Sequence, residues 1–187
     1  MELSAEQEKE LLNRFNTGDD PERVFTELLG HFQKRVYWHI RRIVINHEDA
    51  DDVLQNTFIR IWEKLGSFRG ESRLYTWIFR IATNEALSFL QKKQNRMSIS
   101  MDELQEQLGD SLKASTYFNG NRTELILQQA ILSLPEKQRL VFNMKYYEGL
   151  KYEEIEEILG TSVGALKASY HLASKKIEEF VKRTLNS

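Results

Sequence analysis

Basic and aromatic side chains gather along residues 68–93, and their chemistry favours contact with nucleic acid. Cations bind the phosphates of a nucleic acid, and aromatic rings stack on unpaired bases at about 1–3 kcal/mol per base. A helix that offers both groups suits a strand whose bases have been exposed. The candidate residues are Phe68, Arg69, Arg73, Tyr75, Phe79, Arg80, Asn84, Lys92 and Lys93.

The same stretch allows a plainer interpretation, in which the aromatic side chains pack in the core and the basic side chains form the solvated face of an ordinary helix. Aromatic residues at helical spacing belong to a hydrophobic core more often than to a base-binding platform, and we assign Trp77 and Phe89 to the core. Basic side chains on a helix usually form a solvated face. Ser72 is the expected N-cap of this helix, because its hydroxyl can accept from free backbone N–H groups near Tyr75.

A second candidate surface lies on the preceding helix, expected from residue 49 to 65. One face of that helix carries acids and amides, and Ile59 is an apolar residue among them. An apolar residue in that setting is typical of a partner-binding patch. The opposite face has the spacing of a buried stripe, formed by Val53, Leu54, Thr57, Phe58, Ile61, Trp62 and Leu65.

The last third of the chain contains a helix-turn-helix pattern. A short helix over 152–159, a glycine turn at 160–162 and a longer helix to Arg183 have the required order. An ordinary helical hairpin would give the same pattern. In a recognition helix, the N-terminal part enters the major groove and cations contact phosphates. The groove-facing candidates are Lys167, Ser169 and His171, and the phosphate candidates are Lys175 and Lys176.

Nothing in the sequence predicts an enzyme, and we expect neither a cofactor nor a metal. The chain has no cysteine, which excludes disulfides, thiolate metal sites and cysteine catalysis. It also lacks a phosphate-binding glycine loop and an HExxH pattern. The histidines are far apart and lack ligand spacing, so we assign structural or surface roles to His31, His39, His47 and His171.

The elements that must position these residues are all expected to be helices. The 187 residues are 41% apolar and 29% charged with two prolines, which favours an all-α fold. We expect two small helical domains joined by a flexible linker. These are an N-terminal helical bundle over 1–93, a polar linker over 94–123 and a C-terminal helix-turn-helix domain over 124–187. A weak amphipathic pattern over 101–108 suggests one short helix in the linker.

Apolar runs and the N-terminus bear on location. No run approaches the roughly 18 apolar residues of a membrane span, and the acidic N-terminus lacks a secretory segment. We therefore expect a cytoplasmic protein without membrane insertion.

Helix-start signals are clear at two places, a Ser4–Gln7 capping box and Asp20 followed by Pro21. Gly149 is suited to a left-handed C-terminal cap.

Charge is segregated along the chain, although the net charge is only −2. Residues 31–45 carry a net charge of +4, residues 67–96 carry +4 and residues 161–187 carry +3, whereas the other segments are acidic. Local basic patches of this kind suffice for binding nucleic acid. The acidic linker either mimics nucleic acid in a basic channel or serves as a soluble tether.

Two long stretches resemble one known family. The first runs DADDVLQNTFIRIWEKL and continues, after two residues, as FRGESRLYTWIFRIATNEA. It resembles the second conserved region of the sigma-70 family, and most closely its extracytoplasmic-function (ECF) branch, the promoter-recognition subunits of bacterial RNA polymerase. The stretch from LILQQAILSLPEKQ to SYHLASKKI resembles the fourth region. Ser169 and Leu172 replace arginines common in that helix, and Lys151 stands where a capping Ser or Thr is usual.

The resemblance implies binding to core RNA polymerase and to promoter DNA, with polymerase supplying all the chemistry. Docking on the coiled coil of the largest subunit would use Asp52, Gln55, Asn56 and Ile59. Contacts with the melted −10 element would use Phe68, Arg69, Arg73, Tyr75, Arg80 and Asn84, with Phe68 and Asn84 lining a pocket for one flipped base. The final helix would read the −35 element. The polymerase flap and an anti-sigma factor are further implied partners.

Two other hypotheses about the function remain open at this point. A response-regulator-type DNA-binding protein shares the helix-turn-helix pattern, and it would bind specific duplex DNA alone, usually as a dimer. A helical adaptor without a nucleic-acid role would show no salt-dependent DNA binding. A gel shift with and without core polymerase separates these readings from a sigma factor.

Overall fold

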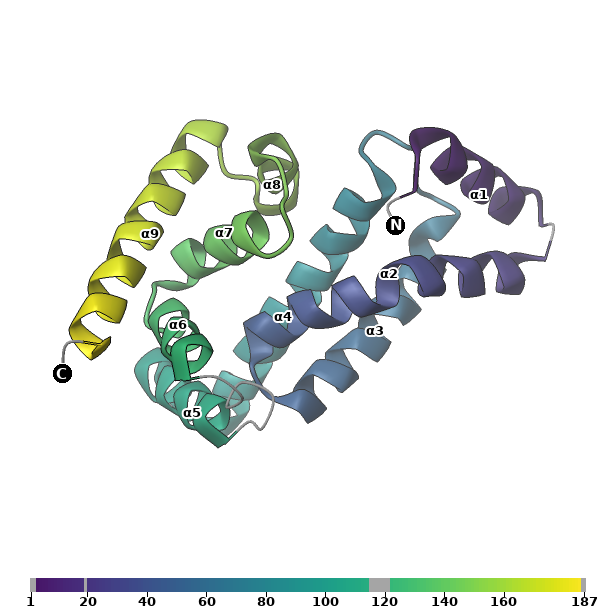
Figure 1. Cartoon of the computed structure of the whole chain (residues 1–187). Coiled ribbons are helices and arrows are strands. Elements are labelled where there is room, and N and C mark those ends of the chain that lie inside the picture. The colour runs from purple at the N-terminus through teal and green to yellow at the C-terminus, as the bar shows by residue number, and fades with distance from the viewer. Residues whose placement is uncertain (1–2, 19, 115–121, 186–187) are drawn as a thin grey trace.

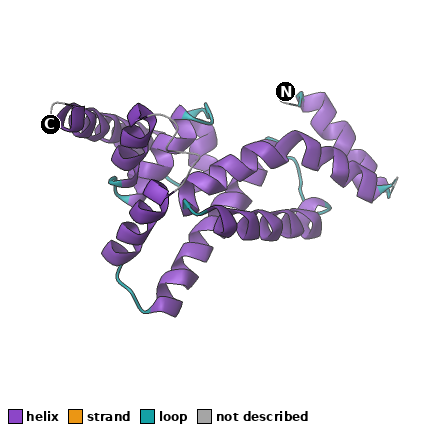
Figure 2. Cartoon of the chain, turned by 60° about the horizontal axis from the view of Figure 1, so that its bottom comes forward, coloured by secondary structure: helices purple, strands orange, loops and turns teal. Residues whose placement is uncertain are grey.

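The computed structural model describes residues 3–18, 20–114 and 122–185, and all regular elements within them are helices (Figures 1 and 2). This confirms the expected all-α fold. The helices are α1 (Ala5–Thr17), α2 (Pro21–Val44), α3 (His47–Leu65), α4 (Leu74–Met97), α5 (Met101–Ala114), α6 (Arg122–Leu132), α7 (Glu136–Tyr146), α8 (Tyr152–Leu159) and α9 (Val163–Leu185).

The helix starts that depend on local patterns occur where they were expected. Ser4 Oγ accepts from the backbone N–H of Gln7 at 3.2 Å, and the Ser4 N–H donates to Gln7 Oε1 at 2.8 Å. The Asp20 carboxylate accepts from the backbone N–H of Arg23, and Pro21 is the first residue of α2. These contacts satisfy backbone donors that a helix leaves unpaired at its start.

The N-terminal domain is a bundle in which α2, α3 and α4 pack against one another and α1 packs on α2 (Figure 1). Its fully buried side chains include Leu28, Ile40, Ile61, Leu65 and Ile78. The bundle was predicted to end at residue 93, but its last helix, α4, continues to Met97.

The start of α4 corrects one sequence prediction. Arg73, not Ser72, occupies the N-cap position, and it makes no side-chain capping bond. The missing acceptor comes from another helix, because Glu8 Oε2 of α1 accepts from the backbone N–H of Leu74 at 3.2 Å. A carboxylate also suits the positive end of the helix dipole. Phe79, expected on the exposed basic and aromatic face, is instead fully buried.

The C-terminal domain consists of α6 to α9. A small core of this domain is formed by Ala130, Ile131, Leu134, Phe142, Ala173 and Ile177. Other buried side chains of the domain, among them Met144, Ile155 and Leu166, belong to the same hydrophobic cluster as the core of the N-terminal bundle. Helix α8 has the bounds that the sequence predicted. Helix α7 ends at Tyr146, before Gly149. Its C-cap residue, Tyr147, has a right-handed helical backbone conformation. Gly149 does adopt a positive φ of 68°, but in the loop between α7 and α8 rather than as the cap of α7.

Helix α5 occupies part of the segment expected to be a linker, which confirms the amphipathic signal near 101–108. Its side chains Leu104, Leu108 and Leu112 are buried. Gln105 Nε2 donates to the carbonyl of Leu132 at 2.7 Å, which ties α5 to the end of α6. Residues 115–121 of the linker lie outside the described part of the chain.

Candidate nucleic-acid interface

A row of side chains crosses from the α3–α4 loop onto one face of α4. Phe68 of the loop packs on Trp77, with ring centroids 5.0 Å apart and planes tilted by 40°. Trp77, Arg80 and Asn84 are spaced i, i+3 and i+7, so they share one face of the helix. Arg80 and Asn84 are exposed and Phe68 is half-buried. The row therefore offers a supported aromatic ring, a cation and an amide to solvent.

Arg73, another candidate DNA contact, is held by α1. Its Nε and Nη2 donate to the Glu8 carboxylate at 3.0–3.1 Å, and Nη2 also donates to the Leu3 carbonyl at 2.8 Å. Its guanidinium lies 5.6 Å from the Tyr75 ring centroid. The side chain thus has fixed geometry while 43% of its surface stays exposed. Arg69 is exposed in the loop between α3 and α4.

Tyr75 does not join the row. It is 6% exposed, and its hydroxyl donates to the carboxylate of Glu154 in α8. The structure therefore brings Phe68, Arg80 and Asn84 together with Trp77 and directs Tyr75 toward the C-terminal domain. Trp77 was assigned to the core from the sequence, and its second role as the support for Phe68 was missed.

A buried histidine fixes the part of α4 that carries Asn84. The Thr83 hydroxyl donates to the Phe79 carbonyl at 2.7 Å, so it must accept from His39 Nε2, which lies 2.8 Å away and therefore carries the proton. Burial, with a smaller effect of the Arg42 charge, lowers the pKa of His39 from 6.5 to about 3. The imidazole is neutral at physiological pH and acts as a structural link between α2 and α4.

The α3 surface has the exposure that the sequence suggested. Asp52, Gln55, Asn56 and Ile59 are all exposed, and their spacing places them on one face of the helix. Ile59 is 56% exposed. The face borders an apolar groove between α2 and α3, lined by Glu22, Phe25, Thr26, Leu29, Gln55, Phe58, Ile59 and Trp62.

Trp62 corrects the expected buried stripe of α3. Its side chain is 39% exposed at the edge of the groove, where it packs edge-on against Phe15 and Phe25 with centroids 5.5 and 5.0 Å away. The groove was not predicted from the sequence, because Phe25 and Leu29 have the spacing of ordinary core residues of α2. An exposed apolar patch of this kind marks a surface for another molecule.

Helix α9 separates its five candidates into two groups. Lys167, His171 and Lys175 recur every four residues on one exposed side of the helix. Ser169 and Lys176 are two turns apart on the other side of the buried stripe, and Lys176 Nζ donates to Gln138 Oε1 of α7 at 3.1 Å. One side of α9 is therefore exposed to solvent, whereas Lys176 on the other side contacts α7 of the same domain.

Neither a metal cluster nor a membrane helix is found among the described residues. Within ranges 3–18, 20–114 and 122–185, no group of three His, Cys, Asp or Glu residues is placed to hold a metal ion. Over the same ranges, no helix has the length and hydropathy that crossing a bilayer needs.

Comparison with known proteins gives consistent matches to both domains. Residues 28–96 match the family model described as "Sigma-70 region 2", and residues 124–177 match "Sigma-70, region 4". The chain is 31% identical to the RNA polymerase sigma-H factor of Pseudomonas aeruginosa over 185 residues, which is 95% of each protein. It is 32% identical to the ECF RNA polymerase sigma-E factor of Haemophilus influenzae over 176 residues, covering 90% of this chain and 92% of the other.

Solved structures share the fold. The sigma factor RpoE from Bartonella quintana, crystallised with the anti-sigma factor NepR, gives a TM-score of 0.67 at 21% identity, covering 84% of this chain and 96% of the other. CnrH, in complex with the cytosolic domain of CnrY, gives a TM-score of 0.69 at 20% identity, with coverages of 94% and 97%.

Proposed function

The chain belongs to the ECF branch of the sigma-70 family, and from this membership we propose how its surfaces act in transcription initiation. The N-terminal domain mounts the protein on core RNA polymerase and holds the melted −10 strand. The C-terminal domain reads the −35 duplex. The protein performs no bond chemistry of its own, and polymerase supplies that chemistry.

The row on α4 is the observation that carries this proposal. Phe68 rests on Trp77, so it offers a base a ring that is already fixed in place. Asn84 supplies an amide that can bond a base edge, and Arg80 supplies a cation for phosphate. Extruding one base costs a few kcal/mol, and stacking with edge contacts offsets that cost. The row thereby favours the opened strand over the closed duplex.

The α3 face and its groove are the proposed docking surface for polymerase. Asp52, Gln55 and Asn56 provide polar contacts at the rim, whereas Ile59 and Trp62 provide the apolar contacts. Polar residues around a desolvated apolar centre are the usual arrangement of a protein interface. The partner on this surface is the coiled coil of the largest polymerase subunit, as the family resemblance implies.

The exposed side of α9 is the proposed −35 reader. Lys167 and His171 lie in the first half of the helix, the part that a recognition helix places in the major groove. Lys175 lies one turn further along and is placed for phosphate. The arginine-to-guanine contact is the commonest specific contact in the major groove, and this side carries no arginine among its exposed candidates. Lysine and histidine contacts would therefore set its specificity.

Two further partners and a location complete the proposal. The family resemblance extends to the polymerase flap, which would receive the C-terminal domain. Both structural relatives were solved with a second protein, named in one case as an anti-sigma factor, so we infer that such a factor binds this chain. Work on bacterial polymerase and chromosomal DNA requires a cytoplasmic protein.

Run-off transcription with core polymerase over a promoter library tests the proposal. We expect initiation at a defined subset of promoters, with permanganate-reactive thymines in the −10 region that depend on this protein. A gel shift supplies the control: promoter binding should need core polymerase. Sequence-specific duplex binding by the protein alone, with no stimulation of polymerase, would instead identify a response-regulator-type DNA-binding protein.

A further inference from the structure

A large apolar side chain stands on the exposed surface of α9. Leu172 is 48% exposed, and within the described part of the chain it belongs to neither cluster of buried side chains nor to the partly buried ones packed against them. Helix α9 lies at the edge of the structure, where it packs on α6, α7 and α8 (Figure 1). Single exposed leucines are common on protein surfaces, so the surroundings of Leu172 must decide whether it has a role.

Leu172 lies beside the centre of the exposed side of α9. With 3.6 residues per turn, Ala168 and Lys175 lie opposite the buried Leu166. His171 and Leu172 lie to either side of the line through Ala168 and Lys175. Because Ala168, one turn before Leu172, has a short side chain, it does not shield the leucine toward the start of the helix. Leu172 therefore projects from the part of α9 that faces away from its own domain.

The charge around Leu172 is positive. Residues 163–177 carry three lysines and no acidic residue. Ile59, the exposed apolar residue of α3, instead has Glu63 one helical turn after it. Duplex DNA carries one negative charge per roughly 1.7 Å of its axis, so it favours a cationic surface and disfavours an acidic one. The setting of Leu172 thus suits duplex DNA, whereas that of Ile59 suits a protein.

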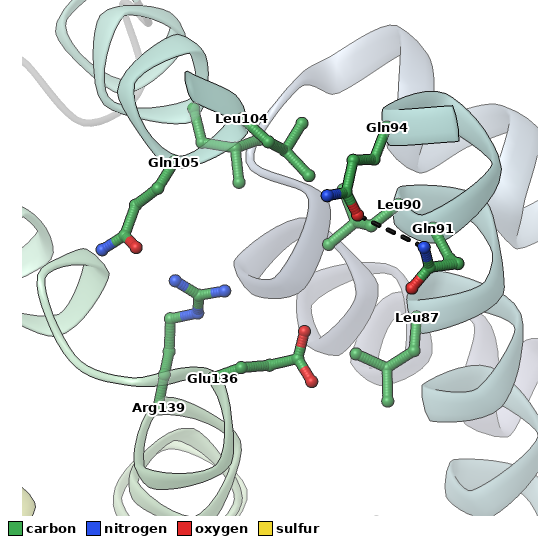
Figure 3. Close-up of a pocket in the computed structure, with 9 residues that line it drawn as sticks. Leu87, Leu90, Gln91, Gln94, Leu104, Gln105, Glu136 and Arg139 are labelled. Carbon is green, nitrogen blue, oxygen red and sulfur yellow. Dashed lines mark hydrogen bonds between the residues drawn. The ribbon is translucent and has the colours of Figure 1, made fainter. Parts of the chain in front are cut away.

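Neither arginine of residues 124–187 is placed for the guanine contact that is commonest in the major groove. Arg139 is 6% exposed and donates from Nη1 to the Leu132 carbonyl at 3.2 Å. Figure 3 shows its guanidinium directed into a pocket between α4, α5 and α7, toward Gln105. Arg183 is in the last turn of α9, about 30 Å from the start of that helix, whereas the groove is about 12 Å wide. Other types of side chain must therefore read the bases.

We propose that Leu172 is a specificity-determining residue that packs against the C5-methyl group of thymine in the −35 element. The inference rests on the proposed function, because it takes α9 to be the −35 reader. Thymine alone among the four bases presents a methyl group in the major groove, and apolar side chains recognise it by contact. Lys167 and His171 bond the polar edges of neighbouring bases, and Leu172 selects thymine at its own position.

Removal of one methyl group from the DNA tests this contact. Deoxyuridine replaces thymidine, one position at a time, in a −35 duplex taken from a promoter that the holoenzyme opens in the library experiment. The replacement keeps the base pair and every hydrogen-bonding group. We expect one or two positions at which it weakens holoenzyme binding about fourfold, the effect of one buried methyl group. Anisotropy competition titrations with the unmodified duplex measure the change.

Two leucine variants assign the effect to its side chain. Leu172→Ala should bind the thymidine and deoxyuridine duplexes with equal affinity at the sensitive positions. Leu185→Ala is the matched control, because Leu185 of the same helix is also exposed, at 56%, and lies near the end of α9. This control should keep the fourfold difference. Circular dichroism checks that both variants retain their helices, and Leu172→Gln replaces Leu172→Ala in the comparison if that variant loses them.

The possible failures of the inference and of the proposed function are distinct. A holoenzyme that opens promoters but binds every deoxyuridine duplex as tightly as the unmodified one would overturn the thymine contact alone. The same conclusion follows if Leu172→Ala keeps the full difference, or if Leu185→Ala loses it to the same extent. A protein that stimulates no initiation with core polymerase would overturn the proposed function, and the thymine contact with it.

Discussion

The carboxylate of Glu8 caps helix α4, although the two residues that it joins there, Glu8 and Leu74, are 66 positions apart in the chain. The same carboxylate receives the Arg73 guanidinium at 3.0 Å. One acid of α1 therefore fixes both the start of α4 and the orientation of a candidate DNA contact. Helix α1 therefore helps to position the proposed −10 surface, in addition to covering the core.

We predict that Glu8→Ala destabilises the N-terminal domain by about 2 kcal/mol, because it removes a cap and leaves a helix start and a guanidinium without their acceptor. Urea denaturation followed by circular dichroism gives the free energy of unfolding. Glu10→Ala, an exposed change on the same helix, is the control and should leave that free energy within the error of the measurement. Equal stability of the two variants would remove α1 from this role.

Two cations of α4 should behave differently. Arg80 is exposed on the row with Asn84, whereas Lys93 Nζ is paired with Asp49 Oδ2 at 2.6 Å. Arg80→Ala should therefore weaken promoter opening and reduce the salt slope of single-strand binding by about 0.7. Lys93→Ala should lower stability and leave that slope unchanged. Binding titrations over a range of salt concentrations decide the matter, and identical slopes for Arg80→Ala and wild type would contradict the assignment.

The proposed docking face on α3 gives a third prediction. Asp52 is exposed, so Asp52→Lys should abolish binding to core polymerase while the melting temperature stays near that of the wild type. Pull-down with purified core polymerase measures the loss. Glu106→Lys makes the same charge change at an exposed site on α5 and should bind normally. Wild-type recovery of Asp52→Lys would rule out the proposed face.

Local patterns predicted much of this fold, because the physical cause of each element lay within a few residues. The Ser4–Gln7 capping box, the Asp20 cap and the bounds of α8 follow from hydrogen bonds or spacing inside one turn or one helix. The acidic and amide face of α3 is likewise a consequence of helical period alone. These features needed no knowledge of what packs beside them.

The features that were not predicted from the sequence depend on contacts between residues far apart in the chain. Ser72 was the best local cap for α4, but the bundle supplies Glu8 instead. Trp62 had core spacing, yet α2 leaves its edge open beside a groove. The Arg42–Glu148 pair joins residues 106 positions apart, and nothing near either residue marks it. Tertiary packing decides such cases, and periodicity describes only which side of a helix is buried.

The two sides of α9 provide a prediction about −35 recognition. Lys175 lies on the exposed side with His171, whereas Lys176 contacts Gln138 of its own domain. Lys175→Ala should reduce the salt slope of duplex binding by about 0.9, the value for one lost phosphate contact on B-DNA. Lys176→Ala should change it less. Anisotropy titrations of polymerase holoenzyme on −35 duplexes compare them, and a larger effect at Lys176 would reverse the assigned faces.

The buried His39 makes folding stability depend on pH in a defined direction. Its pKa is lowered to about 3 in the folded protein, so between pH 6.5 and that value the unfolded chain binds a proton that the folded chain does not. The free energy of unfolding should therefore fall with decreasing pH by about 1.4 kcal/mol per unit from this group alone. The stabilising contribution is complete above pH 6.5.

A substitution isolates that contribution from the acids that titrate in the same range. His39→Gln keeps an amide N–H that can donate to Thr83 but cannot take up a proton, so its stability should fall less steeply between pH 7 and 5. His171→Gln, at an exposed position, should retain the wild-type slope. Thermal melts at a series of pH values measure both. If His39→Gln and wild type lose stability in parallel, the imidazole is already protonated or solvated in the native fold, and it does not act as the neutral link that positions Asn84.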